Sequence, residues 1–522
     1  MLFFCCACAH STSRIAQIRA RYIAIRLGGL SRYGRGKSGL SHKLRRSLVT
    51  TDLVESTAEQ VDAAASASAS AAESWATSSG AARSRLLRGL AKALDSERQP
   101  LVDIADRETQ LGVTRLNGEL DRTVFQLRAF AALVEAGVPF EQLDDPAVSG
   151  GPPAGHPRLT RIRVPIGPVA MFAASNFPFA FSVLGGDTAS ALAAGCPVVV
   201  KAHPGHTEFS RAVFELACAV LSAQQLPAGI VQMVQGTSVD VGVRLVRHPA
   251  ICAVAFTGSF KGGTALQAQA NVRQRPIPFY GELGSINPVV VLPTALQHQP
   301  EDLAQSLAAS IAQGSGQFCT CPGLVIVRDN AEGAAFIAML ATSLAAAKPH
   351  AMLTPEIRRA YDSAINCITT LKDVHTLIRL PRDPEKAQPT PFLAVVDTQT
   401  FMRRHELREE IFGPACIVVK VATLDETVEV LQAIEGSLTA TIWGAESATA
   451  GNLRLARVAM GIAGRVLFSG VPTGVAITAA QQHGGPWPAS TQAFTTSVGH
   501  AALDRFLRPV ALQDAPEWLV RL

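Results

Sequence analysis

Apolar positions between Ser56 and Gly137 recur with the period of an amphipathic helix. The pattern predicts a set of helices, and Thr57 is a suitable residue to begin the first of them. The expected helices cover residues 57–75, 81–97, 100–110 and 119–136. The stretch 63–72 consists of alanine and serine and could instead be a low-complexity linker, but the apolar periodicity on both sides favours a surface helix.

After a Pro/Gly-rich break at 144–157, short apolar runs alternate with amphipathic segments. This alternation is typical of βαβ units and predicts a parallel sheet. The expected strands are 163–172, 197–201, 231–234 and 251–256. The expected helices between them are 185–194, 206–226 and 238–247, and a further helix opens at the glycines 258, 262 and 263.

A second series of the same kind follows Glu282. It predicts a second α/β domain in the same chain. Its expected strands are 288–291, 324–327, 391–396, 417–421, 440–443 and 464–468, with helices at 301–312, 331–347 and 424–433. Residues 506–512 resemble an edge strand. We therefore expect an α/β protein with one domain from 51–147 and 160–283, a second from 284–465, and an arm and tail from 148–159 and 490–522.

Composition narrows the classes of function. Of the 522 residues, 48% are hydrophobic and 17% are charged, and the formal net charge is +5. No apolar run approaches the roughly 18–20 residues of a membrane span, and no basic patch interleaved with aromatics points to nucleic acid. Three of the ten cysteines lie within the first eight residues and the rest are scattered, which is no disulfide framework and indicates a reducing compartment. Cys319 and Cys321 have no nearby His or Cys to complete a metal site, so we expect no metal.

The first 50 residues have a different composition from the rest of the chain. They contain ten Arg or Lys and no acidic residue, since the first is Asp52. Two interpretations fit: a mitochondrial transit peptide, or a leader added by an upstream start codon. A secretory signal fits less well because no positive segment precedes the apolar opening. We expect a cytoplasmic protein, or a mitochondrial one if the segment is a transit peptide.

Cys319 lies in the glycine-rich stretch Gly314–Gly323, between an expected helix and an expected strand. A lone cysteine there would be interpreted as a buried structural residue, but four further motifs of the chain accompany this one. The accompanying motifs are Ser175–Pro178, Phe256–Ser259, Glu282–Gly284 and Glu409–Pro414. In order and spacing they resemble the signature motifs of the aldehyde dehydrogenase superfamily, and the resemblance runs from about Ser56 to the C-terminus.

The resemblance implies a Rossmann-like cofactor-binding domain, an α/β catalytic domain and a small oligomerisation arm, in a homodimer or homotetramer. It implies that Cys319 attacks the aldehyde, that Asn176 and the Cys319 backbone N–H hold the oxyanion, and that Glu282 is the base that hydrolyses the thioester. A non-catalytic relative and a CoA-acylating relative are the alternatives. The joint presence of the three residues argues against the first, and Glu282 favours hydrolysis over transfer.

The same resemblance implies a nicotinamide cofactor. Gly258, Ser259 and Gly263 match a turn that holds the pyrophosphate at a helix N-terminus. Lys201 matches the lysine that reaches the adenosine ribose, and Glu410 and Phe412 match the pair beside the nicotinamide ribose and ring. NAD-preferring relatives often carry an acid three residues after the lysine, where this chain has Pro204. We therefore expect NADP, with NAD also usable.

Longer segments resemble one group within the superfamily, the 2,5-dioxovalerate dehydrogenases. These segments are 174–182, 185–197, 201–204, 316–323, 471–475, 483–486 and 506–510. The implied reaction oxidises 2,5-dioxopentanoate to 2-oxoglutarate, with another small aldehyde or semialdehyde as the alternative, because Ser469 departs from the usual Asn of the group. The far carboxylate of that substrate requires a cation. Arg122 and Gln126 share a helix face and are the expected substrate residues with Phe177, and the alternatives for the cation are Arg128, Arg161 and Arg163.

Overall fold

The computed structural model describes residues 54–379 and 388–520. The basic segment 1–50, with its two interpretations, lies outside the described residues. None of the described helices combines the length and the hydropathy that a bilayer span requires.

The first described elements are the predicted helices. They are α3 (Ala58–Ala76), α4 (Gly80–Ser96), α5 (Arg98–Thr109) and α6 (Val113–Glu135). Thr57 and Gln60 cap α3 reciprocally, each side chain accepting from the other's backbone N–H. The Ala/Ser stretch is helical, as predicted, while α6 begins six residues before the predicted start at 119. The earlier start places Arg115 on the same helix as Arg122.

A five-stranded sheet follows in the order β5-β4-β3-β6-β7, and all its strands are parallel. Its strands are β3 (Val169–Phe172), β4 (Val198–Lys201), β5 (Val231–Val234), β6 (Ala253–Thr257) and β7 (Phe279–Glu282). The order reverses direction between β3 and β6. In open parallel sheets, ligands bind at the carboxyl ends of the strands beside such a reversal.

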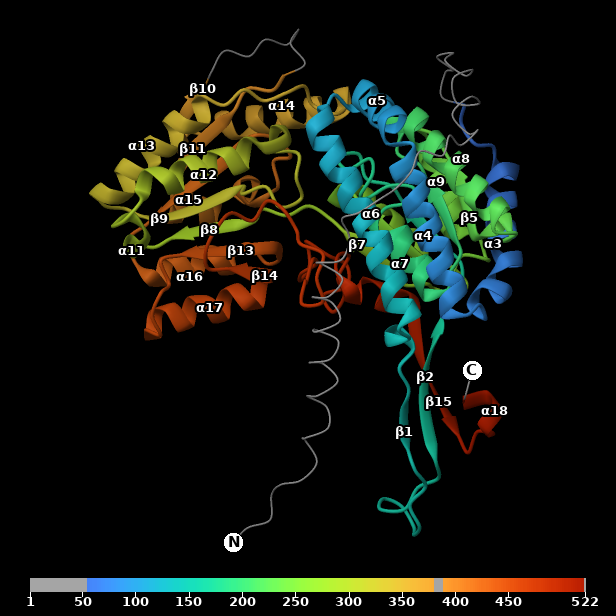
Figure 1. Cartoon of the computed structure of the whole chain (residues 1–522). Helices are drawn as coiled ribbons and strands as arrows, with labels where there is room; N and C mark the ends of the chain where they lie inside the picture. Colours follow the sequence, from blue (N-terminus) through green and yellow to red (C-terminus); the bar gives the residue numbers. More distant parts are fainter. Residues whose placement is uncertain (1–53, 380–387, 521–522) are drawn as a thin grey trace, which may run out of the picture. The chain divides into compact units, whose positions relative to one another are not determined.

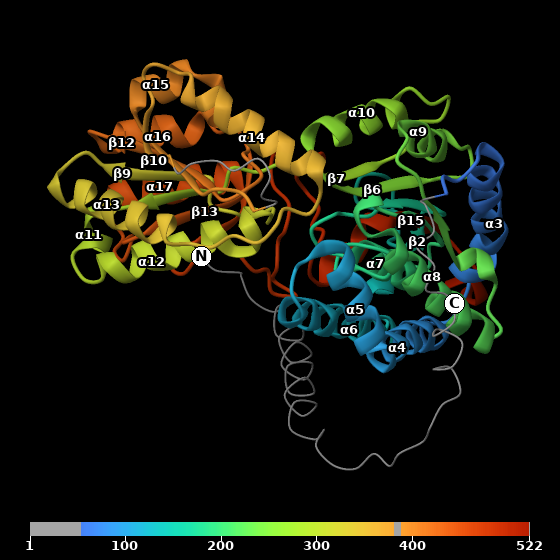
Figure 2. The same ribbon diagram turned by 90° about the horizontal axis from the view of Figure 1, so that it is seen from above.

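Helices cover both faces of this sheet, because its strands are apolar on both sides. One face packs on α4, α5 and α6, on α7 (Gly186–Ala194) and on α8 (Thr207–Ala223). The other packs on α3, on α9 (Val239–Arg247) and on α10 (Phe260–Asn271). Figure 2 shows these two layers, with α9 and α10 on one side and α4 to α8 on the other.

The second sheet has seven strands in the order β10-β11-β12-β9-β8-β13-β14, parallel except for β10. The strands are β8 (Pro288–Val291), β9 (Leu324–Arg328), β10 (His375–Arg379), β11 (Phe392–Asp397), β12 (Ala415–Val421), β13 (Ser437–Trp443) and β14 (Ala463–Leu467). On one face lie α12 (Pro300–Ala312) and α13 (Ala331–Ala345). On the other lie α14 (Pro355–Thr369), α15 (Thr398–Arg403), α16 (Leu424–Gln432) and α17 (Ala450–Ile462). The elements α14, α15, α17 and β10 were not predicted from the sequence.

The predicted strand 163–172 is wrong as a single element. It is two strands, β2 (Leu159–Pro165) and β3, separated by a bend in which Gly167 has φ +110°. The strand β2 pairs antiparallel with β1 (Leu143–Asp145) and with β15 (Leu507–Gln513), so these three form a separate sheet. Figure 1 shows β2 and β15 extending together below the five-stranded sheet.

Candidate active site

The carboxyl ends of the five-stranded sheet gather most of the predicted residues. Lys201 ends β4 and Glu282 ends β7. The loop with Asn176 follows β3, and Gly258 and Ser259 follow β6. These positions lie at the strand-order reversal, where a ligand crevice is expected.

Cys319 reaches this edge through a turn that only small residues can form. Gly314, Ser315 and Gly316 have φ of +58°, +57° and +69°. The Ser315 hydroxyl donates to the His350 carbonyl at 2.7 Å, which holds this non-glycine residue in the left-handed region. A Cβ on Gly316 would lie 2.1 Å from the backbone of Gly413. The turn therefore packs directly on the Glu409–Pro414 motif.

The Asn287 side chain holds the turn that carries Cys319 through hydrogen bonds. Its amide nitrogen donates to the carbonyl oxygens of Cys319 and Cys321, at 2.8 and 2.9 Å. Its Oδ1 accepts from the hydroxyls of Ser285 and Thr439, both at 2.9 Å. Sequence analysis missed this fully buried residue, although polar residues clustered just after Glu282 were an available signal.

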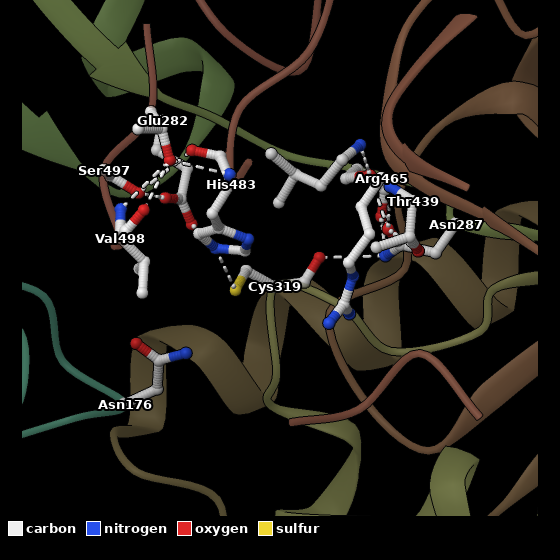
Figure 3. Close-up of polar contacts among 12 residues, drawn as sticks. Asn176, Glu282, Asn287, Cys319, Thr439, Arg465, His483, Ser497 and Val498 are labelled. Atoms are coloured by element: carbon white, nitrogen blue, oxygen red, sulfur yellow. Dashed lines mark hydrogen bonds and ion pairs between the residues drawn. The ribbon is translucent and has the colours of Figure 1, made fainter. Parts of the chain in front are cut away.

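Cys319, Glu282 and His483 form one hydrogen-bonded cluster (Figure 3). The Nε2 atom of His483 lies 3.5 Å from Cys319 Sγ and 3.1 Å from Glu282 Oε1. The Ser497 hydroxyl donates to Glu282 Oε2 at 2.6 Å. Glu282 and His483 are buried, with 5% and 1% of their surface exposed. From the sequence, His483 was named only within the segment 483–486, and Ser497 was not predicted, because each is far from Glu282 along the chain.

The surroundings shift the pKa of the Cys319 thiol and the pKa of the Glu282 carboxyl group in opposite directions. Burial raises the pKa of the Cys319 thiol well above its usual value, and the nearby carboxylates of Glu282 and Glu410 raise it further, while Arg122 opposes them. Burial would also raise the pKa of Glu282, but its interactions with His483 and Ser497 outweigh burial and lower it. Without substrate or cofactor, the Cys319 side chain is therefore a thiol at neutral pH, and the Glu282 side chain is a carboxylate.

Asn176 lies beside the turn that carries Cys319. Its side chain is buried, and its Nδ2 donates to the carbonyl of Gln317 at 3.0 Å. Figure 3 draws its amide nitrogen turned toward the side of the Cys319 sulfur. Glu119 on α6 orders the loop, because its Oε1 accepts from the backbone N–H groups of Phe179 and Ala180 at 2.8 and 3.0 Å.

Two guanidinium groups lie near Cys319. Arg122 donates to the carbonyl of Val475, and Arg465 donates to the carbonyls of Pro472 and Gly474. Burial lowers the pKa of both arginines, and both interact electrostatically with Cys319. Arg122 was an expected substrate residue, whereas Arg465 was missed.

The other expected substrate residues take different places. Phe177 packs edge-on against Phe318, the neighbour of Cys319, with ring centroids 5.2 Å apart. Gln126 is buried against α7, where a Cβ on Gly186 would come 2.8 Å from its Nε2. Arg128 forms an exposed ion pair with Asp95.

The remaining alternatives for the cation lie on β2, away from this edge of the sheet. Arg161 is exposed there, and Arg163 pairs with Asp504.

The predicted pyrophosphate turn opens α10. The Ser259 hydroxyl accepts from the N–H of Gly262 at 3.2 Å, and a Cβ on Gly263 would lie 2.2 Å from the Leu283 side chain. Lys201 Nζ donates to the Gly236 carbonyl at 2.5 Å. These groups fit a pyrophosphate and a ribose, since the ammonium group at the end of β4 and the helix N-terminus after β6 flank the end of β3 at the same edge of the sheet.

Although Pro204 stands where NAD-preferring relatives often carry an acid, another acidic residue, Glu55, lies near Lys201. Glu55 interacts electrostatically with Lys201 and accepts from the Ser238 N–H at 3.3 Å. It belongs to the segment before α3, so no local pattern connected it with Lys201.

Glu410 and Phe412, predicted to hold the nicotinamide end of the cofactor, lie beside the turn that carries Cys319. Glu410 and Phe412 line a small pocket together with Gly316 and Cys321. A Cβ on Gly284 would lie 2.6 Å from Glu410 Oε2, so the two motifs are in close contact. Burial raises the pKa of Glu410 to about 7, and the Glu282 carboxylate adds to the effect.

Comparison with known proteins agrees with this geometry. Residues 45–485 match the model of the aldehyde dehydrogenase family. "Alpha-ketoglutaric semialdehyde dehydrogenase 2" of Azospirillum brasilense is 42% identical over 440 residues, which are 84% of this chain and 84% of that protein. "Alpha-ketoglutaric semialdehyde dehydrogenase" of Acinetobacter baylyi is 37% identical over 467 residues, which are 89% and 88% of the two chains.

The fold has solved counterparts. The NAD-dependent aldehyde dehydrogenase from Sinorhizobium meliloti superposes with a TM-score of 0.74 at 23% identity, over 89% of each chain. The predicted α/β fold class is thus confirmed, and the chain belongs to the aldehyde dehydrogenase family.

Proposed function

We propose that this aldehyde dehydrogenase oxidises 2,5-dioxopentanoate to 2-oxoglutarate. The names of the two relatives described above support this substrate. The observation that carries the proposal is the position of Arg122 and Arg465, two half-buried guanidiniums close enough to interact with Cys319. A half-buried cation near Cys319 suits a substrate with a carboxylate at the end opposite its aldehyde.

Cys319 acts as the nucleophile in this proposal. Its thiol loses a proton to water, and the thiolate attacks the aldehyde carbon. The resulting oxyanion accepts hydrogen bonds from the Asn176 amide and the Cys319 backbone N–H. The nicotinamide ring, when bound, supplies the hydride acceptor. Loss of the hydride leaves a thioester on Cys319.

Glu282 then completes the reaction. Its carboxylate takes a proton from a water molecule, the hydroxide attacks the thioester carbonyl, and the Cys319 thiolate leaves. The lowered pKa of Glu282 keeps it ionised and ready to accept that proton. The products are the acid and the free enzyme.

For the cofactor we propose the following contacts. Gly258, Ser259 and Gly263 hold the pyrophosphate at the start of α10, and Lys201 reaches the adenosine ribose. On the other side of the crevice, Glu410 holds the nicotinamide ribose and Phe412 packs beside the ring.

We propose that NADP is preferred and that NAD is also used. Pro204 leaves room for a 2′-phosphate near Lys201, while Glu55 partly neutralises that lysine and so limits the preference.

Arg122 holds the far carboxylate in this proposal, with Arg465 beside it and Phe177 lining the path to Cys319. Gln126 supports the same helix from its position against α7. We also propose a cytoplasmic homodimer or homotetramer. Light scattering of the purified protein would give the number of subunits.

The test is direct. Purified protein is mixed with 2,5-dioxopentanoate and either cofactor, and the nicotinamide absorbance is followed. Butanal and other semialdehydes provide the comparison, and added CoA distinguishes hydrolysis from acyl transfer. A kcat/KM for 2,5-dioxopentanoate no higher than that for butanal would contradict the proposed substrate.

A further inference from the structure

One buried side chain of the cluster has no part in the mechanism above. His483 lies in the segment that follows the seven-stranded sheet. Its backbone N–H donates to the Thr496 hydroxyl at 2.8 Å, and its carbonyl accepts from the Ser497 N–H at 2.8 Å. This frame aims one ring nitrogen, Nε2, at both Cys319 and Glu282.

The other ring nitrogen indicates where the proton resides. Within the described part of the chain, Nδ1 of His483 is buried and has no hydrogen-bond partner. A buried N–H without an acceptor is rarer and less favourable than a buried acceptor without a donor. The ring N–H is therefore assigned to Nε2, and Nδ1 is left without a proton. That N–H donates to the Glu282 carboxylate while Cys319 is a thiol.

The sulfur is within reach of the same donor. The Cys319 sulfur, the His483 ring nitrogen and a Glu282 carboxylate oxygen all lie within 4.8 Å of one another. Once the thiol has lost its proton, the His483 N–H lies between two anions and can be shared by both. No rearrangement of the ring is required for this.

We propose that His483 is a catalytic residue, whose Nε2–H stabilises the Cys319 thiolate while remaining bound to Glu282. The inference rests on the proposed role of Cys319 as nucleophile. The thiol proton goes to water, and the ring neither gains nor loses a proton. A hydrogen bond to an ionised group is roughly twice as strong as a neutral one, so this donor favours the thiolate.

The charges around the sulfur show why a donor matters. Glu282 and Glu410 oppose formation of the thiolate, and burial opposes it as well. Arg122 and Arg465 favour the thiolate, but both also donate to backbone carbonyls. His483 adds a hydrogen bond made to the sulfur itself.

The test measures the thiol without any substrate or cofactor. The rate at which iodoacetamide alkylates Cys319 is followed against pH by mass spectrometry of the peptide that contains it. Wild type is compared with His483→Phe, which removes the donor. It is also compared with His483→Gln, whose side-chain amide reaches about as far as Nε2 and donates without exchanging a proton.

We expect His483→Phe to move the alkylation midpoint upward by about one pH unit or more, which is about a tenfold loss of thiolate at neutral pH. Its kcat/KM should fall by about the same factor at neutral pH and recover in alkaline solution. His483→Gln should keep the midpoint within about half a unit of wild type. A purely structural role would lower activity equally at every pH.

Two results would overturn the proposal. One is an unchanged midpoint in His483→Phe. The other is a His483→Gln variant as impaired as His483→Phe, which would mean that the ring itself takes the thiol proton. If His483→Phe does not fold, His483→Asn replaces it, because its shorter amide falls short of the sulfur and should show the raised midpoint. Because the assay needs no aldehyde, its failure is distinct from failure of the proposed substrate.

Discussion

The Asn287 side chain holds Cys319 by its backbone carbonyl, with Nδ2 and the oxygen 2.8 Å apart. Through Thr439 and Ser285 the same side chain is tied to β13 and to the segment after Glu282. The position of Cys319, the proposed nucleophile, therefore depends on a polar network buried beside the seven-stranded sheet. Such a network contributes only when every member has a partner.

Asn287→Ala should affect both stability and rate. It leaves buried carbonyls and hydroxyls without partners, so we expect the free energy of unfolding to fall by about 2–4 kcal/mol. Misplacement of the nucleophile should lower kcat/KM by about 10- to 100-fold in the fraction that folds. Denaturant unfolding and steady-state kinetics measure the two effects. The exposed Asn271 is the control, and equal behaviour of Asn271→Ala would contradict this role.

Glu282→Gln should separate the two halves of the reaction. The first burst of reduced cofactor should remain, because removal of a neighbouring carboxylate does not hinder formation of the thiolate. Later turnover should be slower by about 10²- to 10⁴-fold, since the base for hydrolysis is lost. Rapid-mixing kinetics give both rates. A variant without a burst would show that the carboxylate is needed before the thioester forms.

Arg122→Ala should damage the proposed substrate selectively. We expect KM for 2,5-dioxopentanoate to rise by about 10- to 100-fold, which corresponds to about 1.4–2.7 kcal/mol of lost ion-pair binding. Butanal has no carboxylate, so its kinetics should hardly change. Arg128→Ala, on the exposed side of the same helix, is the matched control. Equal damage to both aldehydes would mean that Arg122 is structural, acting through its contact with Val475.

A carboxylate near Lys201 should favour NAD over NADP, and two variants test this by adding or removing one. Pro204→Glu adds a carboxylate near the proposed 2′-phosphate position and should shift kcat/KM toward NAD by about tenfold or more. Glu55→Gln removes a carboxylate from Lys201 and should shift it toward NADP. Steady-state kinetics with both cofactors measure the ratio. A wild type that clearly prefers NAD would refute the proposed preference for NADP.

The sequence predicted the architecture well because the fold follows from local patterns. Alternating apolar strands and amphipathic helices indicated two parallel sheets, and Thr57 marked the start of α3. The strand 163–172 was mistaken because only tertiary pairing shows that its first half belongs with β15. The contacts Asn287–Thr439 and His483–Glu282 join segments more than 150 residues apart, so the sequence alone could not pair them.

One comparison tests most directly whether the protein oxidises 2,5-dioxopentanoate with Cys319 as its nucleophile and a nicotinamide cofactor as the hydride acceptor. Cys319→Ala, Cys321→Ala and wild type are each incubated with 2,5-dioxopentanoate and cofactor, and 2-oxoglutarate is measured by mass spectrometry. Wild type should form it, Cys319→Ala should lose about 10⁴-fold or more in rate, and Cys321→Ala should keep most of the activity because its buried sulfur contacts the Ile311 carbonyl, away from the cluster. Equal loss in both folded variants, or no 2-oxoglutarate from wild type, would contradict the account.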